Sequence, residues 1–326
     1  MKVQVQSKQF KVQRLRFGVG LIILLGIALL IAALLGSEKL SFFDLSEQQR
    51  VILYDIRLPR VFLGASVGAC LAAAGAAFQA LLRNPLAEPY LLGVSNGAAL
   101  GTMFAFFFFG QYEFARPLAA FAGAALATFA VYHFARSRVG MNTERLVLSG
   151  VIVTTFLSSI IVLLTTLLDA TRLRSFTFWL LGDLSQASGN AFYFALIAAI
   201  IGTIILSFTA RSLNLMMLGE RDALDFGVEV KKTRLIVFAT ASALVGSAVA
   251  ASGSVGYVGL IVPHIVRMMI GSDNRGVIPA TALAGAIFVV LADTVARTAI
   301  APRELPVGAI TALIGAPLFI FLLKKS

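Results

Sequence analysis

Few side chains of this sequence have the type and spacing that catalysis or metal binding would need. Asp293 and Arg297 stand four residues apart, which places a carboxylate and a guanidinium on one helix face, where they can form an ion pair. His133 and His264 are the only histidines, and neither has a second ligand at metal-binding spacing. The single cysteine, Cys70, lies in an apolar stretch and has no disulfide partner. The sequence therefore predicts no catalytic residue and no metal site.

Nucleotide binding is not indicated either. The sequence contains no G-x-x-x-x-G-K-[ST] motif, the loop with which P-loop proteins hold phosphates. The segment Gly253-Ser-Val-Gly256-Tyr-Val-Gly259 is rich in glycine, but it joins two apolar stretches and is not part of a soluble βαβ unit. We therefore expect a chain that is not an enzyme and that carries no cofactor of its own.

The elements that hold these residues are predicted to be transmembrane helices. Apolar residues make up 59% of the chain and charged residues only 13%, with a mean hydropathy of +0.90, whereas soluble domains carry about a quarter charged residues. The net charge of +11 does not indicate nucleic acid, because the basic residues fall in short clusters between apolar runs. We expect one all-α transmembrane domain over residues 1–326, surrounded by membrane lipids.

About ten apolar runs are long enough to cross a hydrocarbon core of about 30 Å, which takes roughly 20 residues. The eighth is short and contains Pro263. Residues 1–16 are predicted to be a polar tail, and the run after them is long enough to be a retained helix, not a signal peptide. The predicted spans are 17–36, 60–82, 91–110, 115–135, 146–168, 190–209, 233–251, 258–271, 277–297 and 306–323.

The orientation of these spans follows from the basic residues. An even number of spans puts both termini on one side of the membrane. About two thirds of the 27 lysines and arginines lie on that side, which the positive-inside rule assigns to the cytoplasm. Both termini are therefore expected to be cytoplasmic.

The longest polar stretch after the tail is 211–234, between the sixth and seventh spans. Glycines at 219 and 227 predict short amphipathic helices with breaks between them. The stretch mixes both charge signs and exposes leucine, methionine and phenylalanine at helical spacing. It is either a helix at the lipid headgroups or a docking surface for a cytoplasmic partner.

Three arginines lie on the opposite, outer side. Arg57 and Arg60 open the second span, and Arg297 closes the ninth. Arginines at helix ends often extend to the headgroups, but three on the outer face run against the positive-inside bias. They would also suit the capture of carboxylates on an external protein.

Six motifs in order give the chain a family resemblance. Together they strongly resemble the FecCD-type permeases that import iron–siderophores, haem and vitamin B12, over roughly residues 45–325. The motifs are Arg57-Leu-Pro-Arg60, Asn84-Pro-Leu-Ala-Glu-Pro89, Leu92-Gly-Val-Ser-Asn-Gly97, Gly219-Glu220, Gly256-Tyr-Val-Gly-Leu-Ile-Val-Pro-His264 and Glu304-Leu-Pro-Val-Gly308.

The resemblance implies a type II ABC importer permease architecture in a bacterial cytoplasmic (inner) membrane. It implies a homodimer, two cytoplasmic P-loop ATPase subunits that hold ATP and Mg, and a periplasmic or lipid-anchored substrate-binding protein. Arg57, Arg60 and Arg297 would receive acidic residues of that binding protein. The coupling helices that seat on the ATPase would contain Gly219, Glu220, Ala223 and Gly227. The residues that line or border the pathway would be Asn84, Pro85, Glu88, Pro89, Gly93, Asn96 and Gly97.

The cargo is the least determined part of this expectation. Glu88 and Asn96 are closer to vitamin B12 permeases, because siderophore relatives often carry Asp and Ser there. Iron chelates are the commoner cargo of the family, so we expect an iron–siderophore or haem first and a corrinoid second. The alternative is a secondary transporter driven by an ion gradient, which the scarcity of carboxylates within the spans disfavours.

Overall fold

The fold is an α-helical bundle, described by a computed structural model over residues 2–36, 46–109, 115–137, 140–141, 143–185 and 189–325. Each of the ten predicted spans corresponds to a helix. These helices are α1 (Lys2–Leu34), α3 (Leu58–Leu82), α4 (Val94–Phe108), α5 (Ala115–Ala135), α6 (Thr143–Thr165), α8 (Gly189–Leu218), α10 (Val230–Ser252), α11 (Val258–Ile270), α12 (Asn274–Thr298) and α13 (Val307–Lys325).

Seven of these helices are long and apolar enough to cross a membrane, and α4, α11 and α13 are shorter apolar helices. The 13 residues of α11 reach only about 20 Å at about 1.5 Å per residue, less than the hydrocarbon core. The prediction of about ten spans is confirmed as ten apolar helices, of which seven are long enough to cross a membrane.

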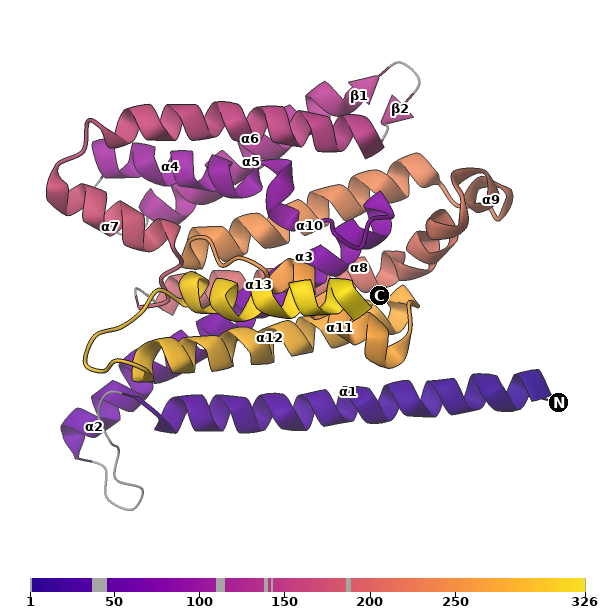
Figure 1. Cartoon of the computed structure of the whole chain (residues 1–326), viewed down its shortest axis with the longest axis horizontal. Coiled ribbons are helices and arrows are strands. Elements are labelled where there is room, and N and C mark those ends of the chain that lie inside the picture. The colour runs from indigo at the N-terminus through magenta and orange to yellow at the C-terminus, as the bar shows by residue number, and fades with distance from the viewer. Residues whose placement is uncertain are drawn as a thin grey trace.

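The two ends of the bundle differ in the elements that they carry (Figure 1). One end, the α9 end, holds the short helix α9 (Glu220–Asp225), the connection between α11 and α12, and both termini. The other, the α7 end, holds α2 (Glu47–Val51), α7 (Ala170–Leu180) and the connection between α12 and α13. Both termini therefore lie toward the same end, as an even number of spans requires.

Helix α3 is the centre of the bundle. It packs against α8, α10, α11 and α12, and most of its side chains are buried. The pair α4 and α5 packs together with α6 as a second layer, and α1 lies along α12 at the edge (Figure 1). A large share of the core is alanine, as expected where helices approach closely without a hydrophobic driving force.

Glycines allow the closest of these approaches. A Cβ atom on Gly68 of α3 would lie 2.1 Å from the carbonyl oxygen of Gly285 in α12. A Cβ atom on Gly97 of α4 would lie 2.4 Å from the carbonyl oxygen of Gly123 in α5. Glycine at both positions therefore allows the backbones of neighbouring helices to approach closely.

Several elements differ from the predicted ones. The predicted tail 1–16 is helical from Lys2 onward and continuous with the first span. The second span is preceded by α2 and a π-helical segment, η1 (Ile52–Arg57), so that one helical run covers 47–82. Helix α7 and the two-residue strands β1 (Arg136–Ser137) and β2 (Gly140–Met141) were not predicted. Such short elements have no apolar run that a search for spans would find.

Candidate functional site

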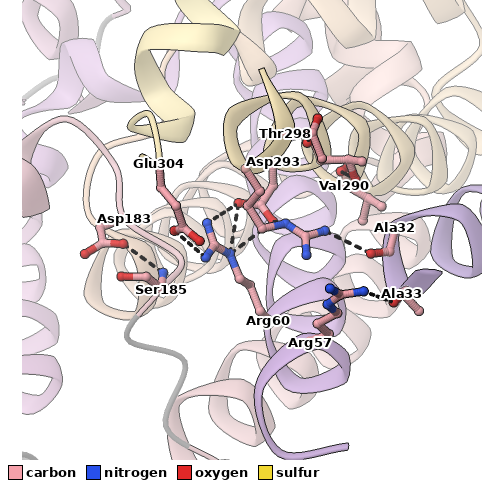
Figure 2. A network of polar contacts seen from close by, with 12 residues as sticks. Ala32, Ala33, Arg57, Arg60, Asp183, Ser185, Val290, Asp293, Thr298 and Glu304 are labelled. Atoms are coloured by element: carbon pink, nitrogen blue, oxygen red, sulfur yellow. Dashed lines mark hydrogen bonds and ion pairs between the residues drawn. The ribbon is translucent and has the colours of Figure 1, made fainter. Parts of the chain in front are cut away.

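The three arginines of the α7 end form one polar network with two carboxylates (Figure 2). Arg60 donates from Nη2 to Asp293 Oδ1 at 2.9 Å and from Nη1 to Glu304 Oε2 at 2.7 Å. Arg297 Nε lies 3.1 Å from Asp293 Oδ2, so the i,i+4 pair predicted from the sequence is present. Asp293 therefore stands between two guanidinium groups and joins α3 to α12.

The remaining guanidinium groups bond the backbone at the end of α1. Arg297 Nη2 donates to the carbonyl of Ala32 at 3.0 Å. Arg57 donates to the carbonyls of Ala33 at 3.3 Å and Leu34 at 3.0 Å. These carbonyls belong to the last turn of α1, which has no intrahelical partners for them, so the arginines act as a C-terminal cap.

The burial of this network differs from what the sequence suggested. Arg57, Arg60 and Arg297 are only 5%, 7% and 4% exposed, so they do not extend to the headgroups. Sequence reasoning treated them as helix-end arginines and gave no role to Glu304, although it lies in one of the motifs. Three cations and two carboxylates leave the network a formal charge of +1. Only the Glu304 side chain, 39% exposed, reaches the surface.

A small cavity gives access to the network from the α7 end. It has a volume of about 130 Å³ and is lined by all three arginines, Glu304 and residues of α2–η1 and the end of α1, namely Gly36, Ile52 and Ile56. A cavity of that size admits a carboxylate, and its walls carry the positive groups that would bind one.

Two segments that interrupt the α-helices meet in the middle of the bundle. The segment after α3 contains η2 (Pro89–Leu92), and the segment before α11 covers 253–257. The hydroxyl of Tyr90 accepts from the amide of Val255 and donates to its carbonyl, both at 3.0 Å. The carboxylate of Glu88 accepts from the amide of Tyr257 at 3.4 Å.

This meeting point lies well inside the bundle. Pro89 packs against Gly259, and Gly259 lies against Gly75 of α3, seven residues or about 10 Å before that helix ends at Leu82. The chain after α3 therefore folds back between the helices. Irregular backbone at membrane depth occurs only where protein buries it or where it borders a water-filled space.

The predicted pathway residues divide into two groups. Asn84 and Pro85 are exposed at the turn after α3, and Glu88 is half-buried. Asn96 instead bonds α6, with its amide nitrogen 3.1 Å from the carbonyl of Thr154 and 2.6 Å from Ser158 Oγ. Gly93 has a left-handed φ of 75° and begins α4, Pro89 is buried, and Gly97 packs on α5. The residues of the first group are exposed or half-buried, and those of the second contribute to helix packing.

The predicted coupling segment is α9 with the ends of its neighbours. Helix α8 runs on to Leu218 and α10 begins at Val230, so 211–234 is partly continuous with the two spans. The predicted breaks at Gly219 and Gly227 are both present, and Gly227 has a φ of 77°. Glu220 forms an ion pair with the buried Arg234.

The outer surface of this segment is apolar. Ala223 is fully buried, whereas Leu218, Leu224 and Phe226 are exposed, Phe226 to 71%. One of these large apolar side chains lies on α9 and the others lie just before and just after it, and all three are exposed among the described residues. A surface of this kind is typical of a site where another protein binds.

A second polar network at the α9 end was not predicted. Arg14 of α1 donates to Asp273 Oδ2 at 2.6 Å, and Asn214 of α8 donates to Asp273 Oδ1 at 2.6 Å. Asp273 is the N-cap of α12. Burial tends to raise the pKa of Asp273, but hydrogen bonds from Arg14, the Arg275 amide and Asn214 outweigh it, and its pKa lies below the usual value.

This lowered pKa predicts a pH-dependent difference. Because the pKa of Asp273 is lower in the folded chain, its stabilising contribution is present above its unfolded pKa of about 3.9 and is lost as pH falls through the folded value. We expect Asp273→Asn to lower the melting temperature of the detergent-purified chain at pH 7, with the difference from wild type shrinking below about pH 4. A difference that is constant from pH 7 to pH 3 would contradict this.

The number and length of the apolar helices define a polytopic membrane protein. A family model, the FecCD transport family, matches residues 21–325. The chain therefore belongs to the FecCD transport family, whose members are permease subunits of ABC importers, and the resemblance found in the six motifs is confirmed.

Individual relatives agree with this membership. The chain is 43% identical to the cobalamin import system permease protein of Halobacterium salinarum, over 86% of this chain and 76% of the relative. It is 39% identical to the hemin transport system permease protein of Yersinia pestis, over 94% of each. A solved ABC transporter assigned to the metal-chelate type, in an inward-facing conformation, has a TM-score of 0.85 at 34% identity and covers 96% of this chain and 100% of that one.

Proposed function

We propose that this chain forms the transmembrane pathway of an ABC importer for a large metal chelate of the tetrapyrrole class, a corrinoid first and haem second. Family membership over nearly the whole chain carries the proposal. The relatives named for cobalamin and hemin, and the residues Glu88 and Asn96, support a tetrapyrrole over an iron–siderophore.

The partners in this proposal fit the two ends of the bundle. The exposed apolar residues on and beside α9 would seat on a cytoplasmic P-loop ATPase subunit, which would hold the ATP and Mg. The arginine cavity at the α7 end would receive a carboxylate of a substrate-binding protein. Two copies of the chain would enclose the pathway. Both termini would be cytoplasmic, and since relatives occur in bacteria and archaea, the membrane is best described as the cytoplasmic membrane.

The mechanism would be alternating access. ATP binding would draw the two ATPase subunits together and move α9, which is joined to α8 through Gly219 and to α10 through residues 226–229. Those helices pack on α3, so their movement would displace the segments 84–93 and 253–257 that meet beside it. The cargo would cross between two copies without a tight ligand set on this chain.

The test is co-purification of the tagged chain with the products of its neighbouring genes, followed by ATPase and uptake assays in liposomes. Recovery of a P-loop subunit, with hydrolysis stimulated by a binding protein loaded with cobalamin, haem or an iron–siderophore, would support the importer and rank the cargoes. A chain that purifies alone and moves substrate with an ion gradient would support the secondary transporter instead.

Leu224→Asp is expected to uncouple transport. Leu224 is an exposed residue of α9, so a carboxylate there leaves the fold intact and places an unpaired charge in the proposed ATPase contact. We expect at least a tenfold loss of ATPase co-purification with an unchanged melting temperature. Ile300→Asp, an equally exposed apolar position at the α7 end, is the control. Equal ATPase recovery in both variants would contradict the assignment. Glu220 is a poorer target because its carboxylate pairs with the buried Arg234.

Glu304→Gln is expected to tighten binding of the substrate-binding protein. Glu304 already forms an ion pair with Arg60, so a carboxylate of the binding protein must compete with it. Its removal raises the formal charge of the network from +1 to +2, and we expect about three- to tenfold higher affinity with a steeper salt dependence. Glu47→Gln removes an exposed negative charge at the same end and is the control. Weaker binding by Glu304→Gln would show that Glu304 orients Arg60 for the partner.

A further inference from the structure

A large cavity lies beside α9, on the side of α8, α10 and α12. It has a volume of about 750 Å³, and its lining is both polar and apolar. The basic side chains come from three different elements: Arg211 from α8, Lys232 from α10 and Arg275 from α12. Ten of its twelve lining residues belong to the stretch 211–234, but of the exposed apolar residues proposed to contact the ATPase only Phe226 lines it.

The charge of the cavity favours an anion. Arg211, Lys232 and Arg275 face a single carboxylate, that of Glu229, which lies 3.5 Å from Lys232. The cavity therefore has a formal charge of +2. Ser212 and Thr233 add hydroxyl groups to the same wall. Such a set binds a phosphate through charge-assisted hydrogen bonds.

The cavity also continues an apolar surface along α8. Ile197, Ile201, Ile204 and Phe208 are exposed, Phe208 to 84%. They recur at intervals of three and four residues, and the next positions in that series are Arg211 and Leu215, which both line the cavity. On an ideal helix these six residues fall within about 80° of one face.

The depth of the cavity agrees with the thickness of a membrane. Phe208 stands 19 residues after α8 begins at Gly189, or about 30 Å along the helix. That length equals the hydrocarbon core, so the exposed stripe covers the acyl region and Arg211 lies at headgroup level.

We propose that this cavity binds the headgroup of an anionic phospholipid of the cytoplasmic leaflet, with an acyl chain along the α8 stripe. The ligand must be anionic at one end and apolar over the next 15 Å or so, the distance from Arg211 back to Ile201. An acidic segment of an ATPase subunit matches the charge but not the stripe. Basic pockets between transmembrane helices on the cytoplasmic side bind anionic headgroups in this manner.

Because the cavity lies beside α9, a lipid bound in it would affect transport. Phe226, Gly227 and Val228, which follow α9, form part of the cavity wall. A bound headgroup would therefore hold the connection between α9 and α10 against α8 and α12. This consequence depends on the function proposed above, whereas lipid binding itself does not.

Lipid titration of the purified full chain tests the proposal without the partners. Native mass spectrometry would measure the binding of dioleoyl-phosphatidylglycerol and of dioleoyl-phosphatidylcholine. Both lipids would be titrated onto the wild type and onto Arg211→Gln/Arg275→Gln. We expect phosphatidylglycerol to bind more tightly than phosphatidylcholine. The double variant should lose about thirtyfold in affinity for phosphatidylglycerol, because it removes about one electrostatic contact per arginine. Its affinity for phosphatidylcholine should not change.

Two further variants make the result specific. Arg172→Gln/Arg174→Gln removes two exposed arginines from α7 at the opposite end and should change phosphatidylglycerol affinity less than threefold. Arg211→Lys/Arg275→Lys keeps the charge and should keep most of the affinity. If the glutamine variant does not fold, the affinities of the two lipids for the wild type and for the lysine variant still test the proposal.

Several outcomes would overturn the proposal. Equal binding of the two lipids by the wild type would do so, as would unchanged phosphatidylglycerol binding by the glutamine variant. Full displacement of phosphatidylglycerol by millimolar inorganic phosphate would mean that the cavity binds a free anion. If the glutamine variant no longer co-purifies with the ATPase subunit but keeps its affinity for phosphatidylglycerol, the cavity would instead be a contact site for that subunit.

Discussion

Gly68→Ala is expected to cause a large loss of stability of the bundle. The added Cβ atom would lie 2.1 Å from the carbonyl oxygen of Gly285 and 3.0 Å from the amide nitrogen of Ala286, both backbone atoms of α12 that no rotamer change can move away. The contact is reciprocal, because a Cβ on Gly285 would lie 2.3 Å from the carbonyl oxygen of Gly68. Helices α3 and α12 would have to separate along their length, which we expect to cost about 3 kcal/mol or more.

A second glycine-to-alanine variant makes this test specific. Gly26 lies in α1 with nothing within 4 Å of its added Cβ. Gly26→Ala should be neutral or slightly stabilising, because alanine is better than glycine in a helix by about 0.5–1 kcal/mol. The measurement is the yield and melting temperature of each variant in detergent. Similar melting temperatures for the two variants would show that the α3–α12 contact relaxes easily.

The number and order of the spans could be predicted because each one needs its own long apolar run. The run after Phe17 and the run before Arg211 are examples, and both become helices. The depth of the segments after α3 and before α11 could not be predicted in this way. Glycine and proline mark these breaks in the sequence, but only the contact between Tyr90 and Val255 shows that the two breaks meet inside the bundle.

The arginine network was predictable in its members but not in its arrangement. Asp293 and Arg297 share one helix, so their spacing is sufficient to predict the pair. Arg60 is 233 residues away from Asp293, and nothing in a single sequence joins them. Arginine is expected at the surface because burying its charge is costly. Here the carboxylates of Asp293 and Glu304 and the last carbonyls of α1 compensate for that cost.

Asp293→Asn is expected to give the second large loss of stability. Its side chain is 3% exposed and lies 2.9 Å from Arg60 and 3.1 Å from Arg297, so its carboxylate serves two buried cations. Asparagine removes the charge with little change of volume. Breaking a buried pair by removing one partner costs about 3–5 kcal/mol, because the charge that remains is uncompensated. The control is Asp169→Asn, whose carboxylate is 58% exposed and pairs only with Arg172, and it should cost about 1 kcal/mol or less.

A double variant separates charge balance from other causes of instability. Asp293→Asn/Arg297→Gln removes one negative and one positive charge, so the network returns to its formal charge of +1 and Arg60 keeps its bond to Glu304. If uncompensated charge is the cause, the double variant should recover at least 1 kcal/mol relative to the sum of the two single variants in a double-mutant cycle. Additive losses would mean instead that the hydrogen bonds from Arg297 to the end of α1 hold the helix in place independently of Asp293. In that case α1 depends on the arginine itself, and the carboxylate serves mainly to position Arg60.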